Sequence, residues 1–251
     1  GEAAARDALR AVFERDGIHV IVGSASAVEP GEGGAVRVRV GEEWIEGDML
    51  LVATGRRPNV ASLRLEEAGI RLSESGGLVV DGNLQTSVNS IFAAGDCIQG
   101  MPQFTHLAGR QGFVAARNAM FPGSFRGMPA ALPRCTFTSP EIASVGLTMD
   151  AARAKYGDRV RIVVRQNTHI DRSLCDDDTE GYYAIAVLAD GTIAGATIVG
   201  ARAGEVISEV TLAMTQGVAV SDMALSVHVY PSHAVGLQQV ASQAGSELFH
   251  T

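Results

Sequence analysis

The sequence predicts an α/β part followed by an α+β part. Helix-like and strand-like segments alternate along 251 residues, 46% of which are hydrophobic, enough for one large or two ordinary cores. Residues 121–133 form a Pro- and Gly-rich stretch, which is typical of a boundary between domains. Beyond it the pattern favours an antiparallel sheet with helices on one side. We therefore expect two parts of different architecture, joined by this linker.

The first half is predicted to begin with an amphipathic helix over residues 2–16, because apolar residues recur there at helical spacing. Residues 48–54 (DMLLVAT) are almost wholly apolar, as expected of a strand covered on both faces. Residues 105–120 are predicted to form a second helix. Shorter runs that end at turn-forming residues predict strands at residues 18–22, 36–40, 44–46, 78–80 and 90–94.

The second half is predicted to be richer in strands. Asp190-Gly191 is a strong signal for a two-residue hairpin turn. Two helices, over residues 203–216 and 232–245, are expected to end the chain. The strands are predicted at residues 134–138, 142–146, 161–167, 182–188 and 192–199.

Composition excludes several classes of partner. The net charge of −8 and the scattered Lys and Arg residues argue against nucleic acid and against an anionic membrane surface. We find no apolar run of about 18 residues, the length that a membrane span needs, and nothing that resembles a signal peptide. Cys97, Cys135 and Cys175 are far apart and odd in number, which favours free thiols and a cytoplasmic location. Because the chain opens with Gly1-Glu2 directly into a helix-like stretch, we expect native sequence upstream.

Two motifs carry the chemical information. Residues 52–59 (VATGRRPN) and 90–96 (SIFAAGD) each run from an apolar strand-like segment into a Gly turn. A glycine lets the backbone approach a ligand closely, and a carboxylate just beyond it accepts hydrogen bonds from sugar hydroxyls. Each motif alone is also ordinary turn chemistry. The two in this order, about forty residues apart, are far more specific.

Together, the stretches ATGRRPN and TSVNSIFAAGD resemble the signature of the pyridine nucleotide–disulfide oxidoreductases, the family of dihydrolipoamide dehydrogenase, glutathione reductase and mercuric reductase. Residues 137–148 are similar to the opening of that family's interface domain, and residues 195–204 to its later hairpin and helix start. The resemblance covers essentially the whole chain. It implies that residues 1–54 are the second half of an NAD(P)H-binding domain, residues 55–128 the C-terminal segment of a Rossmann-like FAD-binding domain, and residues 129–251 a dimerisation domain.

The resemblance also implies where the cofactors bind. Asp96 matches the carboxylate that holds the flavin ribityl chain, and a helix beginning near Thr105 matches the one whose N-terminus faces the flavin pyrimidine edge. A helix N-terminus stabilises the negative charge of reduced flavin. An ordinary solvent contact remains the alternative for the His106 side chain. The implied FAD contacts are Thr54, Gly55, Gly95, Asp96, Thr105 and His106.

Several family elements are missing from this chain: both G-x-G-x-x-G fingerprints and the C-x-x-x-x-C redox pair. We therefore expect this chain to be inactive alone, as the C-terminal part of a homodimeric flavoenzyme whose subunits meet through residues 129–251. Apolar helix residues such as Val206, Val210 and Ala213 are expected at that interface. We expect no metal site at Cys175, whose neighbours form an acidic loop.

The expected catalytic residue is Tyr230. Many family members carry H-P-T-x-x-E near the C-terminus, an acid–base pair for a dithiol; here Tyr230 takes the His position and Val235 the Glu position. Tyrosine, with an ordinary pKa near 10, is a poor base at neutral pH. Mercuric reductases also place a tyrosine here, although this chain lacks their C-terminal cysteine pair. The hypothesis is a metal ion or small oxidant as electron acceptor; a dihydrolipoamide-dehydrogenase-like reductase and a silent dimerisation module are the alternatives.

Overall fold

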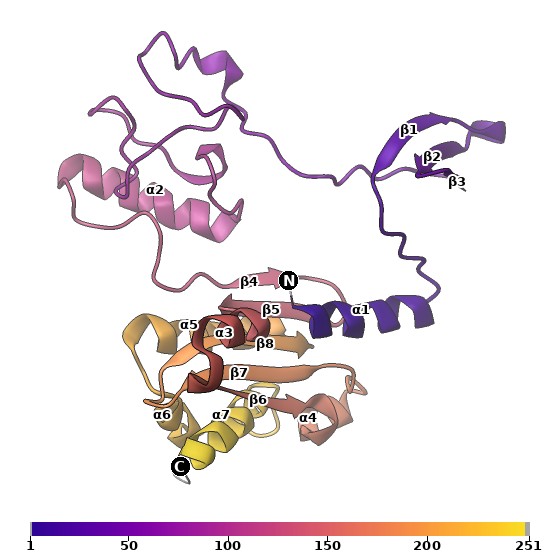
Figure 1. Cartoon of the computed structure of the whole chain (residues 1–251), viewed down its shortest axis with the longest axis vertical. Coiled ribbons are helices and arrows are strands. Elements are labelled where there is room, and N and C mark those ends of the chain that lie inside the picture. Colours follow the sequence, from indigo (N-terminus) through magenta and orange to yellow (C-terminus); the bar gives the residue numbers. More distant parts are fainter. Residues whose placement is uncertain (1, 249–251) are drawn as a thin grey trace.

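A computed structural model describes residues 2–248 of the chain. The described residues form a three-stranded sheet, a loop-rich unit around helix α2 (Thr105–Met120), and a C-terminal unit around a five-stranded sheet. Figure 1 shows these as three separate bodies, with helix α1 (Ala3–Arg15) lying along the C-terminal unit. No described helix is both long enough and apolar enough to span a membrane.

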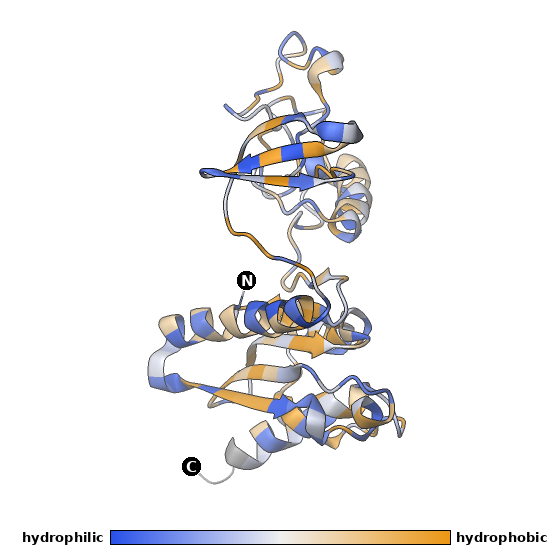
Figure 2. Ribbon diagram, turned by 90° about the vertical axis from the view of Figure 1, so that its right-hand side faces the viewer, coloured by the Kyte–Doolittle hydropathy of each residue, from blue (hydrophilic) through white to orange (hydrophobic). Residues whose placement is uncertain are grey.

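The three-stranded sheet is antiparallel, in the order β1 (Ala25–Pro30), β2 (Val36–Val40), β3 (Glu43–Gly47). Strand β2 alternates Val and Arg, so its two faces differ in polarity, as the colours of Figure 2 show. On the polar face Arg37 pairs with Glu29 at 3.0 Å and lies 4.8 Å above the Trp44 ring. The sequence predicted strands β2 and β3 correctly and gave no strand for β1.

Two predicted strands do not form. Residues 18–22 and 48–54 run as extended chain on either side of the three-stranded sheet, and the second is largely exposed: Met49 by 91%, Leu51 by 87% and Val52 by 70%. Apolar composition favours a strand only where a neighbour supplies hydrogen-bond partners and covers the side chains. Among the described residues, no strand pairs with either segment.

The loop-rich unit is built on α2. Its core packs Leu84, Leu78 and Val114 together, and two buried amides on α2 bind loop backbone. Gln111 Oε1 accepts from the Gly95 N–H at 2.8 Å, while Asn118 Nδ2 donates to the carbonyl oxygens of Asn83 and Phe125. The predicted strands at residues 78–80 and 90–94 are here reduced to isolated bridges, because their backbone groups bond to several separate loop segments rather than to one continuous strand. The Leu78 N–H, for example, donates to the Cys97 carbonyl oxygen and the Ala93 N–H to that of Leu84.

The C-terminal sheet is antiparallel throughout, and its two central strands are buried on both faces. Tyr183, Ile185 and Val187 face one cluster of apolar residues, while the alternating Tyr182 and Ala184 face another. The order is β4 (Arg134–Thr136), β5 (Glu141–Gly146), β8 (Ile193–Gly200), β7 (Tyr182–Leu188), β6 (Val160–Gln166). The predicted hairpin at Asp190-Gly191 joins β7 and β8, but its loop has three residues, 189–191, because the Leu188 N–H donates to the Thr192 carbonyl oxygen. Asp190 accepts from the Thr192 N–H at 2.9 Å.

Helices cover both faces of this sheet, so the prediction of helices on one side is wrong. Helices α5 (Ala203–Gln216), α6 (Val220–Leu225) and α7 (Ala234–Leu248) pack on one face. Helices α1 and α3 (Met149–Tyr156) pack on the other, through Ala5 and Ala152. The sequence did not reveal the short helices α3, α4 (Asp171–Cys175) and α6.

The prediction that the apolar face of α5 lies at a subunit interface is also wrong. Val206, Val210 and Ala213 are 9%, 0% and 4% exposed, and all three belong to the core beneath the sheet. The apolar stripe of α5 is therefore used inside the subunit. Exposed apolar side chains lie instead just after α6, where Val227 is 96% and Val229 80% exposed.

Candidate functional site

The turn at Gly95 lies directly against α2. Gly95 has φ 81°, and a Cβ atom there would lie 2.8 Å from the Cβ of Ala108, which no real side chain tolerates. The Gly95 N–H is held by the buried Gln111 amide. Glycine is therefore required for the turn to dock. The docked turn places the next residue, Asp96, beside the N-terminal end of α2.

A cation joins the two sequence motifs at this point. Arg56 Nη1 lies 3.5 Å from Asp96 Oδ2 and donates to the Gln103 carbonyl oxygen at 3.1 Å. Both side chains of the pair are substantially exposed, so the pair adds little to stability. Its value is geometric, because it brings the residue after Gly55 to the residue after Gly95. No role was predicted for Arg56, although its position directly after Gly55 in the first motif was a signal for one.

The start of α2 presents unpaired backbone donors. The first-turn N–H groups of an α-helix have no intrahelical acceptor, and the N-cap residue here, Phe104, has a side chain that cannot accept a hydrogen bond. The His106 ring stacks on Phe104 with centroids 5.3 Å apart, and its Nε2 lies 3.0 Å from the Pro133 carbonyl oxygen. This contact ties α2 to the linker before β4 and fixes the imidazole.

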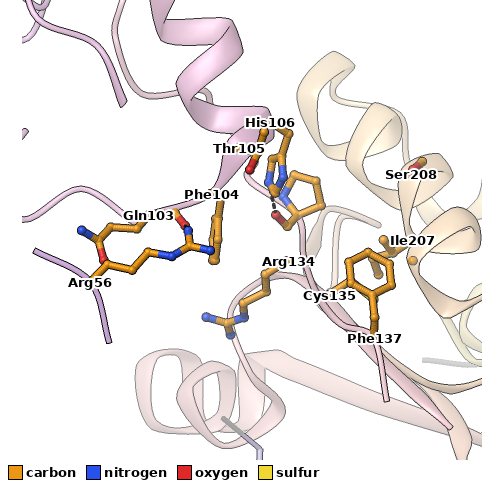
Figure 3. Close-up of a pocket in the computed structure, with 12 residues that line it drawn as sticks. Arg56, Gln103, Phe104, Thr105, His106, Arg134, Cys135, Phe137, Ile207 and Ser208 are labelled. Carbon is orange, nitrogen blue, oxygen red and sulfur yellow. Dashed lines mark hydrogen bonds between the residues drawn. The ribbon is translucent and has the colours of Figure 1, made fainter. Parts of the chain in front are cut away.

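A cavity of about 490 Å³ opens at this helix end, between α2, β4 and α5. Figure 3 shows Arg56 and Gln103 on one side of it, with Phe137 and Ile207 together on the other. A second cavity of about 600 Å³ is lined by Arg56 and Asp96 as well as Gln103. Arg56 and Gln103 thus border both cavities. The arrangement offers a carboxylate, a guanidinium and helix N–H groups to a polar ligand that lies across them.

Of the predicted flavin contacts, Gly95 packs against α2 at Ala108, and Arg56 links Asp96 to the carbonyl oxygen of Gln103 just before that helix. Thr105 and His106 line the first cavity, and Asp96 lines the second. Thr54 and Gly55 are exposed and directly precede Arg56, but neither residue lines either of these two cavities.

The cysteines do not form a redox pair within this chain. All three carry free thiols. Burial, with a smaller contribution from Glu141, raises the pKa of Cys135 to about 11, so this thiol stays protonated at neutral pH. Cys97 Sγ donates to the Ala94 carbonyl oxygen. Among residues 2–248, no group of three or more His, Cys, Asp or Glu side chains is arranged to hold a metal ion.

Tyr230 lies elsewhere, in the segment before α7. Its side chain is 67% exposed, and its hydroxyl donates to Asp171 Oδ2 at 2.9 Å. That contact raises the pKa of Tyr230 above its ordinary value. In this chain Tyr230 is therefore not brought to the Asp96 cavities. His228 and His233 on either side are largely buried and pair with Glu209 and Asp176.

Comparison with known proteins identifies the class to which this fold and site belong. A family model described as pyridine nucleotide-disulphide oxidoreductase matches residues 2–112, and the model of that family's dimerisation domain matches residues 132–241. The chain belongs to this family. Its members are FAD-dependent oxidoreductases that use NAD(P)H.

Particular relatives fall into two groups. A mercuric reductase of Staphylococcus aureus is 39% identical over 207 residues, 82% of this chain and 38% of that protein. A dihydrolipoyl dehydrogenase of Thermus scotoductus is 35% identical over 240 residues, 94% of this chain and 48% of that protein. The chain thus spans about half, or less, of the curated relatives it matches.

Solved structures agree with this fold. LpdA from Mycobacterium tuberculosis matches with a TM-score of 0.89 and 27% identity, over 97% of this chain and 53% of that one. The HOCl-induced flavoprotein disulfide reductase RclA from Escherichia coli matches with a TM-score of 0.85 and 26% identity, over 96% of this chain and 55% of that one.

Replacing Gly95 with Ala should undock the turn that carries Asp96. Gly100→Ala is the matched control, because Gly100 has a similar φ of 73° but open space where the methyl group of an alanine would lie. We expect Gly95→Ala to cost about 1–3 kcal/mol more than Gly100→Ala in urea unfolding, the usual penalty of overpacking. Equal losses in the two variants would show that backbone strain alone, and no close approach to α2, requires this glycine.

Proposed function

We propose that the chain is the C-terminal part of an FAD-dependent NAD(P)H oxidoreductase of the mercuric-reductase-like kind, with a metal ion or small oxidant as electron acceptor. Residues 1–54 would complete an NAD(P)H-binding domain, residues 55–128 an FAD-binding domain, and residues 129–251 would form the dimer. The contact of Arg56 and Asp96 at the start of α2 carries this proposal, since it gathers the groups that one side of a flavin needs.

The residues present fit FAD on that side. The Asp96 carboxylate suits the hydroxyls of the ribityl chain, and the docking of Gly95 leaves the backbone close to the ligand. The N–H groups at Thr105 and His106 suit the pyrimidine edge, which becomes negative on reduction. Thr54 and Gly55 directly precede Arg56, and their backbone would also contact the cofactor. Bound FAD would pass electrons from NAD(P)H towards the acceptor.

The nature of the acceptor is inferred from Tyr230. Its pKa is raised by the Asp171 carboxylate, so at neutral pH the phenol is deprotonated even less often than in an ordinary tyrosine and is less available to accept a proton. Val235 has no proton-binding group to assist it. Both features argue against taking a proton from a dithiol, as a dihydrolipoyl dehydrogenase must. A metal ion or small oxidant makes no such demand, which supports the likeness to mercuric reductase over the likeness to dihydrolipoyl dehydrogenase.

A homodimer would bring Tyr230 to a flavin held by the other subunit. The segment after α6 supports an interface there. Leu225, Val227 and Val229 are each at least 80% exposed, while His228 between them is held by Glu209. Contiguous apolar exposure of this kind marks interaction sites. Stable interfaces of obligate dimers commonly bury more than about 2,000 Å².

The flavin site is tested in the full-length protein. Asp96→Ala should lower its content of bound FAD, because the ribityl hydroxyls lose their acceptor, whereas Asp81→Ala, in the same unit but outside both cavities, should not. Flavin absorbance after gel filtration measures the outcome. The 251-residue chain alone should retain no stoichiometric flavin. Full FAD occupancy in Asp96→Ala would remove the main support for the site.

The acceptor is tested by steady-state kinetics with Hg(II), Cu(II), a quinone and a disulfide. We expect full-length protein to reduce the metal ions or the quinone faster than the disulfide, and Tyr230→Phe to slow that turnover about ten-fold. Tyr156→Phe serves as the control, since Tyr156 lies on α3, away from the Tyr230 segment. Faster disulfide turnover would favour the dihydrolipoyl-dehydrogenase-like alternative instead.

Dimer formation is tested with Val227→Asp, which places a charge in the proposed apolar interface. Light scattering of the unmodified chain at micromolar concentration should give twice the 26.2 kDa of one subunit. Val227→Asp should give a single subunit, because a buried unpaired charge costs several kcal/mol. Met120→Asp, at an exposed apolar site outside residues 129–251, should remain dimeric. A monomeric unmodified chain contradicts the proposal.

A further inference from the structure

Helix α4 holds both ends of the segment that carries Tyr230. Asp171, its first residue, accepts the hydrogen bond from the Tyr230 hydroxyl at 2.9 Å. Asp176, just after its last turn, lies with Oδ2 3.3 Å from His233 Nε2. One short helix thus places two carboxylates that bind positions 230 and 233. The two contacts join segments more than fifty residues apart in sequence.

Buried residues beneath these two contacts fix the position of α4 relative to the Tyr230 segment. Ile170, next to Asp171, is fully buried, and a Cβ at Gly236 would lie 2.5 Å from its Cδ1. The start of α7 therefore rests directly on the residue that precedes α4. Tyr183, in the central strand β7, donates its hydroxyl to the His233 carbonyl oxygen at 2.9 Å. The core of the unit therefore sets where Asp171 stands relative to Tyr230.

The contact supplies a group that the local sequence lacks. Position 235, where the family motif has Glu, is Val in this chain, so nothing within the motif orients residue 230. The structure brings a carboxylate to the same side chain from a different element. With its proton committed to Asp171, the phenol keeps one orientation, and its oxygen remains free to accept a hydrogen bond.

We propose that Asp171 is a positioning residue that replaces the missing glutamate of the motif: through its hydrogen bond it holds the Tyr230 phenol in a fixed orientation towards the acceptor site. The catalytic consequence rests on the proposed function; the contact itself does not. The charged or titratable groups that face Tyr230 are Asp171 and, more weakly, Cys175, both on α4, and both raise its pKa.

The contact is tested in the 251-residue chain with ¹³Cζ-labelled tyrosine, the Tyr230 signal being assigned with Tyr230→Phe. In the unmodified chain this signal should titrate above an ordinary tyrosine, and Asp171→Asn should remove most of that upward shift. Asp177→Asn, which removes the same charge just beyond α4, should leave it nearly unchanged. At neutral pH the Tyr230 signal should also move in Asp171→Asn alone, which makes the test independent of alkaline unfolding.

A Tyr230 signal that is identical in the unmodified chain and in Asp171→Asn overturns the proposal. In full-length protein, Asp171→Asn should lower acceptor turnover about as much as Tyr230→Phe, roughly ten-fold, and the double variant should be no slower than either. Additive losses overturn the positioning role. If Tyr230→Phe leaves turnover unchanged while the Tyr230 signal still responds to Asp171, the proposed role of Tyr230 in the reaction fails and the contact stands.

Discussion

The β7–β8 hairpin is the constraint on which the C-terminal unit depends. Its residues are buried on both faces, so two sets of helices must cover it. Ile185 and its neighbours on one face bind the apolar stripes of α5 and α7, and Ala184 on the other packs with α1 and α3. This double coverage uses the apolar face of α5 inside the subunit. It leaves the segment after α6 as an exposed apolar surface.

The same packing determines where polar groups are presented. The Tyr183 ring is buried in the core, and its hydroxyl donates to the backbone carbonyl oxygen of His233. Ile170, which precedes α4, packs against Gly236 at the start of α7. Tyr230 is thereby held at the surface of the C-terminal unit. The Arg56 and Asp96 site belongs to a different body, built on α2, and meets the C-terminal unit at the cavity that Cys135 and Ile207 line. Under the proposed function, the chain therefore carries two parts of a reaction site that lie apart within one subunit.

The errors of the sequence prediction share a physical cause. Residues 48–54 have the composition of a buried strand, yet composition states only that burial is favourable, not that a covering partner is present. Val206, Val210 and Ala213 were expected at a subunit interface because they form an apolar stripe, and an apolar stripe does not specify which surface it meets. The helix over residues 105–120 was predicted correctly at both ends, because helical periodicity is a property of the local sequence alone.

The sequence by itself determined the family, the order of the strands after residue 130, the hairpin at Asp190-Gly191 and the residues at the start of α2, since motifs, turns and periodicity depend on near neighbours. Only the tertiary structure decided which side chains meet. Arg56 reaches Asp96 across forty residues, and Asp171 reaches Tyr230 across fifty-nine. No spacing rule encodes such pairs, because the distance between two residues on different elements is set by the packing of the core between them.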